Sequence, residues 1–258
     1  MKLRVATLNV YYHARNRLAE RMPLLAEGLA VLAPDIVGLQ EVDRRRDVDR
    51  SLAGDRYGVW RAAEATPSSY PRHWDASSLL IARSAGTVEA HAAARLTHKR
   101  VVQRLLLRTS GGARVCIGNT HLHHPDGQPG ASARLRQVRD VIRFLDEEAS
   151  DATVLLGDLN GEAHEPFFAA LADAGFRSAY AVVHGCEPER TFPSGLISGG
   201  MSPERPVAID YVLTRGAVQP TAASLAWYRP SPSDPTLFAS DHFGVTADLV
   251  MVEPHGSL

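Results

Sequence analysis

Short apolar runs recur along the whole chain, and each is bounded by Gly, Pro, Asp or Ser, which is typical of β-strands. The runs are four to seven residues long, as is usual for strands of globular proteins. They predict nine strands, at residues 3–9, 35–41, 57–62, 77–82, 101–107, 114–120, 153–156, 207–213 and 245–251. The chain is therefore expected to be rich in β-structure.

Two longer segments have the spacing of helices, with apolar residues three or four positions apart. The first stripe ends before Pro34 and consists of Leu18, Met22, Leu25, Leu29 and Leu32. The second has charged residues on its other faces and consists of Leu135, Val138, Ile142 and Leu145. A third, shorter helix is predicted over 164–174, where Gly175 would end it.

Strands outnumber helices, and each long helix leads into a strand. This order favours a strand-rich α/β sandwich over a doubly wound parallel sheet. The chain has neither an internal repeat nor a biased linker, so we expect one domain over 1–258. Nucleotide-binding loops of the GxxxxGK[ST] or GxGxxG type do not occur in the sequence. The Pro-, Ser- and Gly-rich segment 190–206 is expected to be a mobile surface loop beside the strand that holds Asp210.

Composition narrows the class of protein further. The 258 residues are 45% hydrophobic and 22% charged, which excludes a disordered or fibrous chain. Arginine makes up 26 of the 28 cationic residues, yet the net charge is only -1. This balance excludes nucleic-acid binding by a globally basic surface, while a local basic cleft stays possible.

Two cysteines, Cys116 and Cys186, are too few for a disulfide scaffold. Cys116 lies in an apolar run, where a reduced core thiol is expected. The apolar run at residues 2–9 is too short, and too often interrupted by polar side chains, for the hydrophobic region of a secretory signal. Uninterrupted apolar stretches of membrane-spanning length do not occur. We therefore expect a cytoplasmic protein without a membrane span, and a monomer.

Polar residues at strand ends are the most informative feature of the sequence. The predicted strands are followed, interrupted or opened by six polar positions, namely Asn9, Gln40-Glu41, Thr120-His121, Asp158, Asp210 and Asp241-His242. A single buried acid can be purely structural, although an acid in an apolar strand costs several kcal/mol unless it is compensated. Six such positions need a common explanation, and strand ends that converge on one edge of a sandwich supply it.

Convergence of these ends would place Glu41, Asp158, Asp210 and Asp241 in one pocket. Four carboxylates would repel one another strongly unless a cation neutralised them. An all-oxygen ligand set that includes Asn9 indicates Mg²⁺ or Mn²⁺. A zinc site is excluded, because the histidines of 121–124 have neither an HExxH motif nor paired cysteines beside them.

Histidines at the same strand ends fit phosphate chemistry. His121 and His242 lie beside acids, where an imidazolium can stabilise charge on a phosphate or protonate a leaving group. Six other histidines are expected to be solvated or structurally satisfied, namely His13, His73, His98, His123, His124 and His184.

The polar segments, taken together and in this order, resemble the endonuclease/exonuclease/phosphatase superfamily of metal-dependent phosphohydrolases. They span nearly the whole chain and read TLN at 7–9, LQEV at 39–42, NTHL at 119–122, GDLN at 157–160, IDYV at 209–212 and SDHF at 240–243. The resemblance implies a four-layered sandwich of two mostly antiparallel sheets flanked by helices, and in-line hydrolysis of a P–O bond.

Residue roles also follow from this resemblance. Glu41 is implied as the principal Mg²⁺ ligand, with Asn9 and Asp241 contributing directly or through water. Asp158 would orient and deprotonate the attacking water, and Asn160 would hold this water or a phosphate oxygen.

The remaining implied roles concern the histidines. His242 would contact the phosphate, and Asp210 would fix its ring and its charge. His121 would assist the developing charge or the leaving group. The segment at 120–125 departs from that of abasic-site endonucleases, which carry a tyrosine there, and is more similar to the deadenylase-type and sphingomyelinase-type branches.

The sequence thus predicts a Mg²⁺-dependent phosphodiesterase that acts on a small or lipid-like phosphoester. The alternative is an endonuclease or exonuclease that acts on DNA or RNA with the same site. Arginines at 44–46 and at 134, 136, 139 and 143 support the alternative, although the second group has the spacing of a solvated helix face. A non-catalytic binding module is disfavoured, because such a module has no need to keep Asp158, Asn160, Asp210 and His242 together.

Overall fold

The computed structural model describes residues 1–12, 16–42, 47–64, 77–125, 127–197 and 205–252, whose strands form two six-stranded sheets. The first sheet has the order β11 (Val218–Ala226), β12 (Gly244–Met251), β1 (Lys2–Asn9), β2 (Ile36–Gln40), β4 (Ser78–Ala82) and β3 (Tyr57–Arg61). The second has the order β5 (Gly86–Arg95), β6 (Val101–Thr109), β7 (Arg114–His121), β8 (Ala152–Asp158), β10 (Asp210–Gly216) and β9 (Arg177–Ser178).

Both sheets are mostly antiparallel, as predicted. Among the described strands, the parallel neighbours are β1 with β2 and β7 with β8. The strands of the second sheet all lie within residues 86–216, and in the sequence they come between β4 and β11 of the first sheet. The two sheets face each other, since β1 packs on β8 and β10. The predicted α/β sandwich is confirmed.

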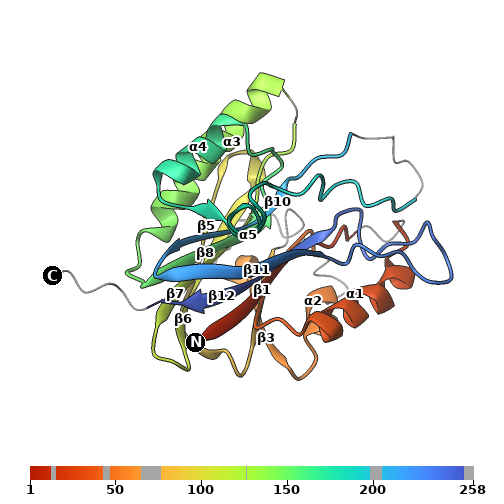
Figure 1. Ribbon diagram of the computed structural model, residues 1–258, viewed down its shortest axis with the longest axis horizontal. Helices are drawn as coiled ribbons and strands as arrows, with labels where there is room; N and C mark the ends of the chain where they lie inside the picture. Colours follow the sequence, from red (N-terminus) through yellow and green to blue (C-terminus); the bar gives the residue numbers. More distant parts are fainter. Residues whose placement is uncertain (13–15, 43–46, 65–76, 126, 198–204, 253–258) are drawn as a thin grey trace.

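Helices cover the outer faces of this sandwich (Figure 1). The helices α3 (Gly127–Leu145) and α4 (Pro166–Asp173) pack together over the second sheet, with Val138 and Phe167 buried beneath them. The helices α1 (Leu18–Leu32) and α2 (Val48–Ala53) belong to the first sheet's side, where Leu25 and Leu29 are buried. The short α5 (Ala179–His184) contacts β10 and β11.

A polar bridge joins the two sheets near one end of the interface. The amide of Asn119 on β7 is fully buried and donates to the carbonyl oxygens of Leu39 and Ser78, at 3.1 and 3.0 Å. Gln40 donates in turn to Asn119 Oδ1 at 2.7 Å. A Cβ on Gly38 would lie 2.9 Å from Leu156 Cβ, so the sheets approach closely here. This bridge fixes the ends of β2 and β7 relative to each other.

The structure adds elements that the apolar pattern did not predict, namely β5, β9, β11, α2, α5 and two short 3-10 helices at Ala62–Glu64 and Thr97–Lys99. β5 and β11 are edge strands, so neither has the near-continuous burial that marks a central strand. Pro220 interrupts β11 at a register shift, which an edge strand tolerates. Cys116 is buried and Cys186 is exposed, and both are free thiols.

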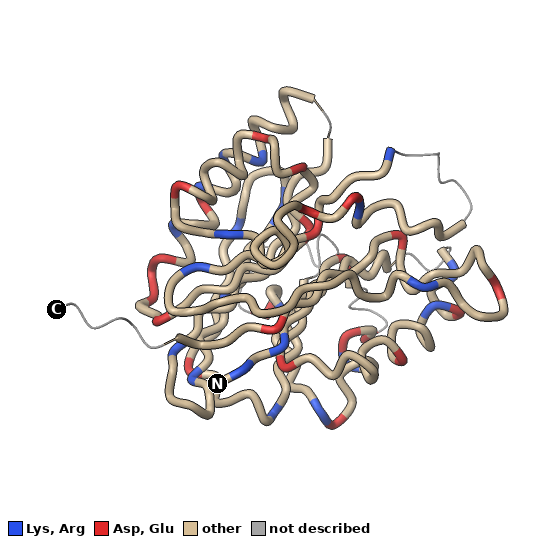
Figure 2. Tube along the Cα trace, in the orientation of Figure 1, with Lys and Arg blue, Asp and Glu red and all other residues tan. Residues whose placement is uncertain are grey.

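Charged residues of both signs are mixed over the described part of the chain, as Figure 2 shows, without a broad region of one sign. This distribution agrees with the net charge of -1. None of the described helices is both long enough and apolar enough to cross a membrane.

One buried ion pair leads to a stability prediction. The Asp49 side chain is fully buried and accepts hydrogen bonds from Arg61 Nε at 2.7 Å and Ser78 Oγ at 2.6 Å. Burial opposes ionisation, but Arg61 and Ser78 outweigh it and hold the pKa of Asp49 below its usual range. We expect Asp49→Asn to lower the free energy of unfolding at pH 7 by about 3 kcal/mol, because Arg61 is left without its buried partner.

The pH dependence of this loss follows from the direction of the shift. A lowered pKa stabilises the folded state above the pKa of the unfolded carboxyl, about 3.9, and this contribution is lost as pH falls through the folded value. The difference between wild type and variant in urea unfolding should therefore shrink from pH 7 to pH 3.5. Asp146→Asn, which breaks a half-exposed pair with Arg215, serves as the control and should cost less than about 1 kcal/mol. Equal stability of wild type and Asp49→Asn at pH 7 would contradict the prediction.

Candidate active site

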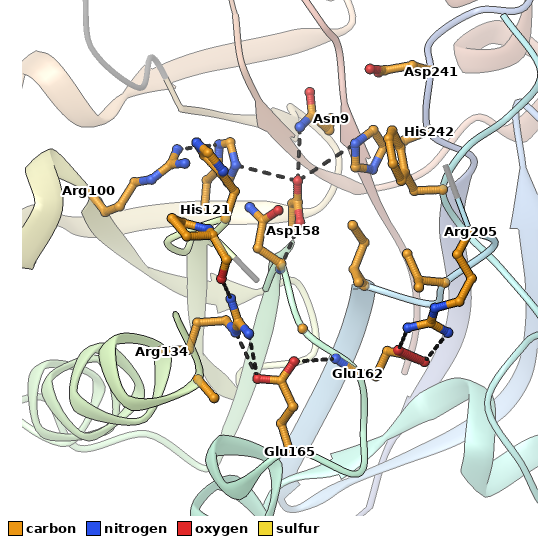
Figure 3. Close-up of a pocket in the computed structure, with 18 of the residues that line it drawn as sticks. Asn9, Arg100, His121, Arg134, Asp158, Glu162, Glu165, Arg205, Asp241 and His242 are labelled. Carbon is orange, nitrogen blue, oxygen red and sulfur yellow. Dashed lines mark hydrogen bonds and ion pairs between the residues drawn. The ribbon is translucent and has the colours of Figure 1, made fainter. Parts of the chain in front are cut away.

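A cleft of about 920 Å³ opens where the strand ends of the two sheets meet (Figure 3). Asn9 ends β1, Glu41 follows β2, His121 ends β7 and Asp158 ends β8. The predicted site residues that line this cleft are Asn9, Glu41, His121, Asp158, Asn160, Asp241 and His242. Asp210 lies behind His242 rather than on the wall of the cleft. The expected convergence of strand ends is therefore observed.

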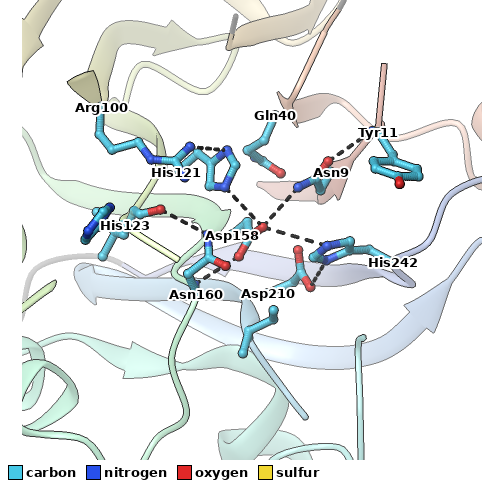
Figure 4. Close-up of polar contacts among 12 residues, drawn as sticks. Asn9, Tyr11, Gln40, Arg100, His121, His123, Asp158, Asn160, Asp210 and His242 are labelled. Carbon is cyan, nitrogen blue, oxygen red and sulfur yellow. Dashed lines mark hydrogen bonds and ion pairs between the residues drawn. The ribbon is translucent and has the colours of Figure 1, made fainter. Parts of the chain in front are cut away.

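Asp158 is the centre of the polar contacts (Figure 4). Its side chain is 1% exposed, and its Oδ2 accepts a hydrogen bond from Asn9 Nδ2 at 3.0 Å. His121 Nε2 lies 3.5 Å and His242 Nε2 lies 3.9 Å from the same oxygen. The other oxygen, Oδ1, accepts from the backbone N–H of Asn160 at 2.9 Å. Residues from both sheets thus surround one carboxylate oxygen.

His242 is held by an acid on its far side. Its Nδ1 lies 2.8 Å from Asp210 Oδ2, which leaves Nε2 directed toward Asp158. Burial alone disfavours the imidazolium, but Asp210, together with the charges of Asp158 and Asp241, outweighs burial, and the pKa of His242 is raised well above its ordinary value. The ring of Phe192 packs on the imidazole, with centroids 4.8 Å apart. His242 is therefore a fixed and positively charged donor at neutral pH.

His121 has a different partner, Arg100, which stands just before β6. Arg100 Nη1 lies 3.0 Å from His121 Nδ1. A guanidinium can only donate, so Nδ1 is the acceptor and the ring proton resides on Nε2. This tautomer directs an N–H toward Asp158. His121 and His242 thus present N–H groups to the same point from opposite sides, as Figure 4 shows.

Asn9 and Asp241 lie near each other at one end of the cleft (Figure 3), and Glu41, which also lines the cleft, is close enough for its charge to act on Asp241. Among the described residues, Asn9 Oδ1 accepts a single hydrogen bond, from Tyr11 N at 3.0 Å, which leaves one of its two lone pairs for another contact. Burial, together with the negative charge of Glu41, raises the pKa of Asp241 to about 6. Two acids and an amide oxygen, with a carboxylate destabilised in its charged form, fit a hard divalent cation such as Mg²⁺.

A second group of potential ligand atoms consists of Asp158, Asp210 and His242, whose atoms lie within 4.8 Å of one another. The raised pKa of His242 favours the protonated imidazolium form of its ring. An imidazolium has no free lone pair with which to bind a metal. We therefore interpret this group as an ion-paired cluster, distinct from the oxygen-rich end of the cleft.

Three residues that line the cleft have a strained backbone. Tyr11, Glu41 and Asn160 have φ angles of 55°, 48° and 51°, in the left-handed region that is unfavourable for residues other than glycine. Such conformations cost about 1–3 kcal/mol each and persist where the surrounding structure imposes them, commonly at functional sites. The strain at Glu41 and Asn160 turns the chain directly after β2 and β8, where the side chains must enter the cleft.

Sequence reasoning missed several arginines and the packing of one loop. Arg134 was expected on a solvated helix face, but it is 3% exposed and binds Glu165 at 2.7 Å. Segment 190–206 was expected to be a mobile surface loop, but Thr191, Ser194 and Leu196 are buried, and Ser194 N donates to Asp241 O at 2.6 Å. Residues 198–204 of this segment lie outside the described residues. Arg205 binds Glu162, and both residues line the cleft, as Figure 3 shows.

Solved structures share this fold over nearly the whole chain. The endonuclease/exonuclease/phosphatase from Bacteroides vulgatus aligns with a TM-score of 0.79 at 18% identity, covering 97% of this chain and 99% of that one. The human Nocturnin catalytic domain with bound sulfate aligns with a TM-score of 0.78 at 22% identity, covering 97% and 94%. D. rerio TDP2 complexed with single-strand DNA product gives 0.77 at 18% identity, covering 97% and 99%.

Sequence comparison agrees with the fold. Nocturnin of Drosophila melanogaster is 26% identical over 273 residues, covering 91% of this chain. The chain spans only 42% of the length of that relative. A sequence model of the Endonuclease/Exonuclease/phosphatase family matches residues 6–242. The match takes in every segment that carries the cleft, and the chain belongs to the endonuclease/exonuclease/phosphatase family of enzymes that hydrolyse phosphoester bonds.

Proposed function

We propose that this protein is a Mg²⁺-dependent phosphodiesterase that cleaves a P–O bond by in-line attack of water, and that residues 1–258 form one catalytic domain. The observation that carries the proposal is the environment of Asp158. This buried carboxylate accepts a hydrogen bond from Asn9, which lies at the oxygen-rich end of the cleft. The imidazole N–H groups of His121 and His242 point toward the same carboxylate. A phosphate placed between these groups meets a base and positive charge at once.

Asn9, Glu41 and Asp241 are the residues proposed to hold the cation, with Mn²⁺ as a possible substitute for Mg²⁺. When bound there, the cation supplies positive charge to the oxygens of the scissile phosphate. The raised pKa of Asp241 supports this assignment, because a nearby cation restores the ionised carboxylate.

The chain's own groups carry out the proton transfers. Asp158 Oδ2 is proposed to accept a proton from the attacking water, which the Asn160 side chain helps to hold. Asn160 Nδ2 donates to Leu122 O at 3.0 Å, so its amide oxygen is turned to a defined position. His242 donates its Nε2–H to a phosphate oxygen, and Asp210 keeps the ring oriented and charged.

His121 is assigned to the leaving group. Its neutral form, with the proton on Nε2, can donate a hydrogen bond to the departing oxygen. Because Arg100 occupies Nδ1, the ring cannot rotate without losing that contact. His121 and His242 therefore stabilise two different oxygens of the same phosphate.

The proposed substrate is a small phosphoester rather than a long polyanion, because acidic and basic residues are interspersed along the described chain without a broad basic region (Figure 2). A nuclease that uses the same residues is the alternative. Turnover of a small diester that changes little between about 50 and 200 mM salt would support the small substrate. A steep loss of single-stranded DNA or RNA binding over the same range would support the nuclease.

The test compares bis(p-nitrophenyl) phosphate, a diester, with p-nitrophenyl phosphate, a monoester. We expect diester hydrolysis with Mg²⁺, loss of activity with EDTA, and recovery when Mg²⁺ or Mn²⁺ is added in excess. Preference for the monoester would contradict the phosphodiesterase assignment. Activity that is unchanged after exhaustive chelation would contradict metal dependence.

A further inference from the structure

Arg21 is a fully buried arginine on α1, on the face that otherwise carries Leu18, Leu25 and Leu29. Its guanidinium donates to four backbone carbonyls. Nε donates to Asn16 O at 2.8 Å, and Nη2 donates to Tyr11 O at 2.5 Å. Nη1 donates both to Val10 O at 2.8 Å and to Ala239 O at 2.9 Å.

These carbonyls belong to two segments that are far apart in the sequence. Val10 and Tyr11 directly follow Asn9, and Ala239 stands two residues before Asp241. One side chain thus ties together the segments that carry two of the three proposed cation ligands. Ser240 reinforces the tie, since its hydroxyl lies 2.6 Å from Asn9 O and 3.1 Å from Asp241 Oδ1.

The contact with Tyr11 reaches the ligand atom of Asn9. Tyr11 has a left-handed backbone, with φ 55°, and its N–H donates to Asn9 Oδ1 at 3.0 Å. Arg21 binds the carbonyl of this strained residue and also lies over its ring, 5.8 Å from the centroid. Arg21 therefore supports the backbone conformation that fixes the Asn9 amide oxygen.

The positive charge of Arg21 interacts with Asp241 and Glu41, two of the proposed cation ligands. Within the described part of the chain, the hydrogen bonds of Arg21 all go to carbonyls, whereas Arg61 and Arg134, two other buried arginines, bind carboxylates. Burial lowers the pKa of Arg21 to about 10, and the nearby acids Asp241 and Glu41 act in the opposite direction. Arg21 is therefore charged at neutral pH, and its charge offsets those of the two acids.

We propose that Arg21 is a positioning residue for the cation site, which aligns the Asn9 and Asp241 segments and balances the acids before the cation binds. The inference rests on the proposed assignment of Asn9, Glu41 and Asp241 as cation ligands. Loss of the positive charge of Arg21 would by itself strengthen cation binding. The test must therefore keep this charge and change only the alignment of the Asn9 and Asp241 segments. Lysine keeps the charge but cannot bridge four carbonyls, because its ammonium is a single point with three donors.

The experiment measures Mn²⁺ binding by calorimetry to the wild type and to Arg21→Lys, without substrate. We expect Arg21→Lys to bind Mn²⁺ at least about tenfold more weakly, as is usual when a group that supports metal ligands is changed. Arg61→Lys is the matched control, since Arg61 is also buried and charged but binds Asp47 and Asp49. Its Mn²⁺ affinity should equal that of the wild type.

The outcomes separate the two proposals. Absence of Mn²⁺ binding by the wild type would contradict the cation site itself, and with it the proposed function. Binding by the wild type with equal affinity in Arg21→Lys would overturn only the role of Arg21. A similar loss in Arg61→Lys would also overturn it, because general destabilisation would then explain both variants.

A second measurement needs no variant and remains available if Arg21→Lys does not fold. The Nε–H of Arg21 is buried and hydrogen-bonded, so its resonance should be observable by NMR. Titration with Mg²⁺ should shift this signal with the same midpoint as the side-chain amide of Asn9, while the Arg61 Nε–H stays in place. Movement of the Asn9 amide without any change at Arg21 would contradict the proposal.

Discussion

Asp158→Asn is expected to lower kcat/KM for a phosphodiester by about 10³-fold, the range in which general-base catalysis contributes. The asparagine cannot take a proton from water. It also offers a single acceptor oxygen where the carboxylate serves both Asn9 Nδ2 and Asn160 N. Activity with bis(p-nitrophenyl) phosphate and Mg²⁺ measures the loss, and circular dichroism verifies that the variant is folded.

Asp151→Asn is the matched control for this change. Asp151 lies directly before β8, at the end of this strand opposite to Asp158. It is exposed and accepts a hydrogen bond from Arg114 N at 2.8 Å. Its replacement should leave kcat/KM unchanged. A folded Asp158→Asn variant with activity close to that of the wild type would show that another group activates the water.

Asp210→Asn is expected to lower kcat by about 10²-fold or more, the usual loss when a donor to the developing charge is removed. Asp210 does not line the cleft, so its effect must act through His242. An amide in its place removes the charge that keeps the buried imidazole protonated. The kcat for the same diester measures this effect, and KM should change less than kcat.

Asp248→Asn provides the comparison for Asp210. Asp248 is also a mostly buried acid on a strand, but it binds Lys2 and Arg4 at the opposite end of β1. Its loss should reduce stability without changing kcat. If Asp210→Asn and Asp248→Asn lower activity to the same extent, the role of Asp210 is structural rather than electrostatic.

The site could be predicted from sequence because its residues stand directly at the ends of strands. Asn9, His121 and Asp158 are each the last residue of a strand whose interior is apolar, so the pattern of polarity alone marks them. Asp210 differs, because its pairing with His242 depends on where β10 begins relative to the loop before β12. The sequence resemblance supplied that pairing, and the structure places the two side chains 2.8 Å apart.

The supporting arginines could not be predicted in the same way. Arg21 follows the helical spacing but has the wrong polarity for a core position, and the carbonyls that satisfy it come from residues as distant as Ala239. Arg134 shares a helix with exposed arginines, and only the fold brings Glu165 to it. Single-residue patterns contain charge and spacing but not the partner, and the partner decides whether a charged group is buried.

Three of the described edge strands, β5, β9 and β11, were missed for a related reason, whereas the edge strand β3 was predicted at 57–62. β5 lies at the edge of its sheet and pairs with β6. Many of its residues are therefore partly exposed, and the strand is rich in alanine. Central strands such as β8 are buried along their whole length and are recognisable as continuous apolar runs.

Division of the cleft between the sheets affects the order in which the protein can become active during synthesis. Asn9 and Glu41 come from the first sheet, while His121, Asp158 and Asp210 come from the second, which is complete at residue 216. Asp241 and His242 leave the ribosome later, followed by β12, the strand that pairs with β1. A nascent chain that has folded its second sheet therefore still lacks one acid and the charged imidazole of the proposed site, and both arrive in the segment just before β12.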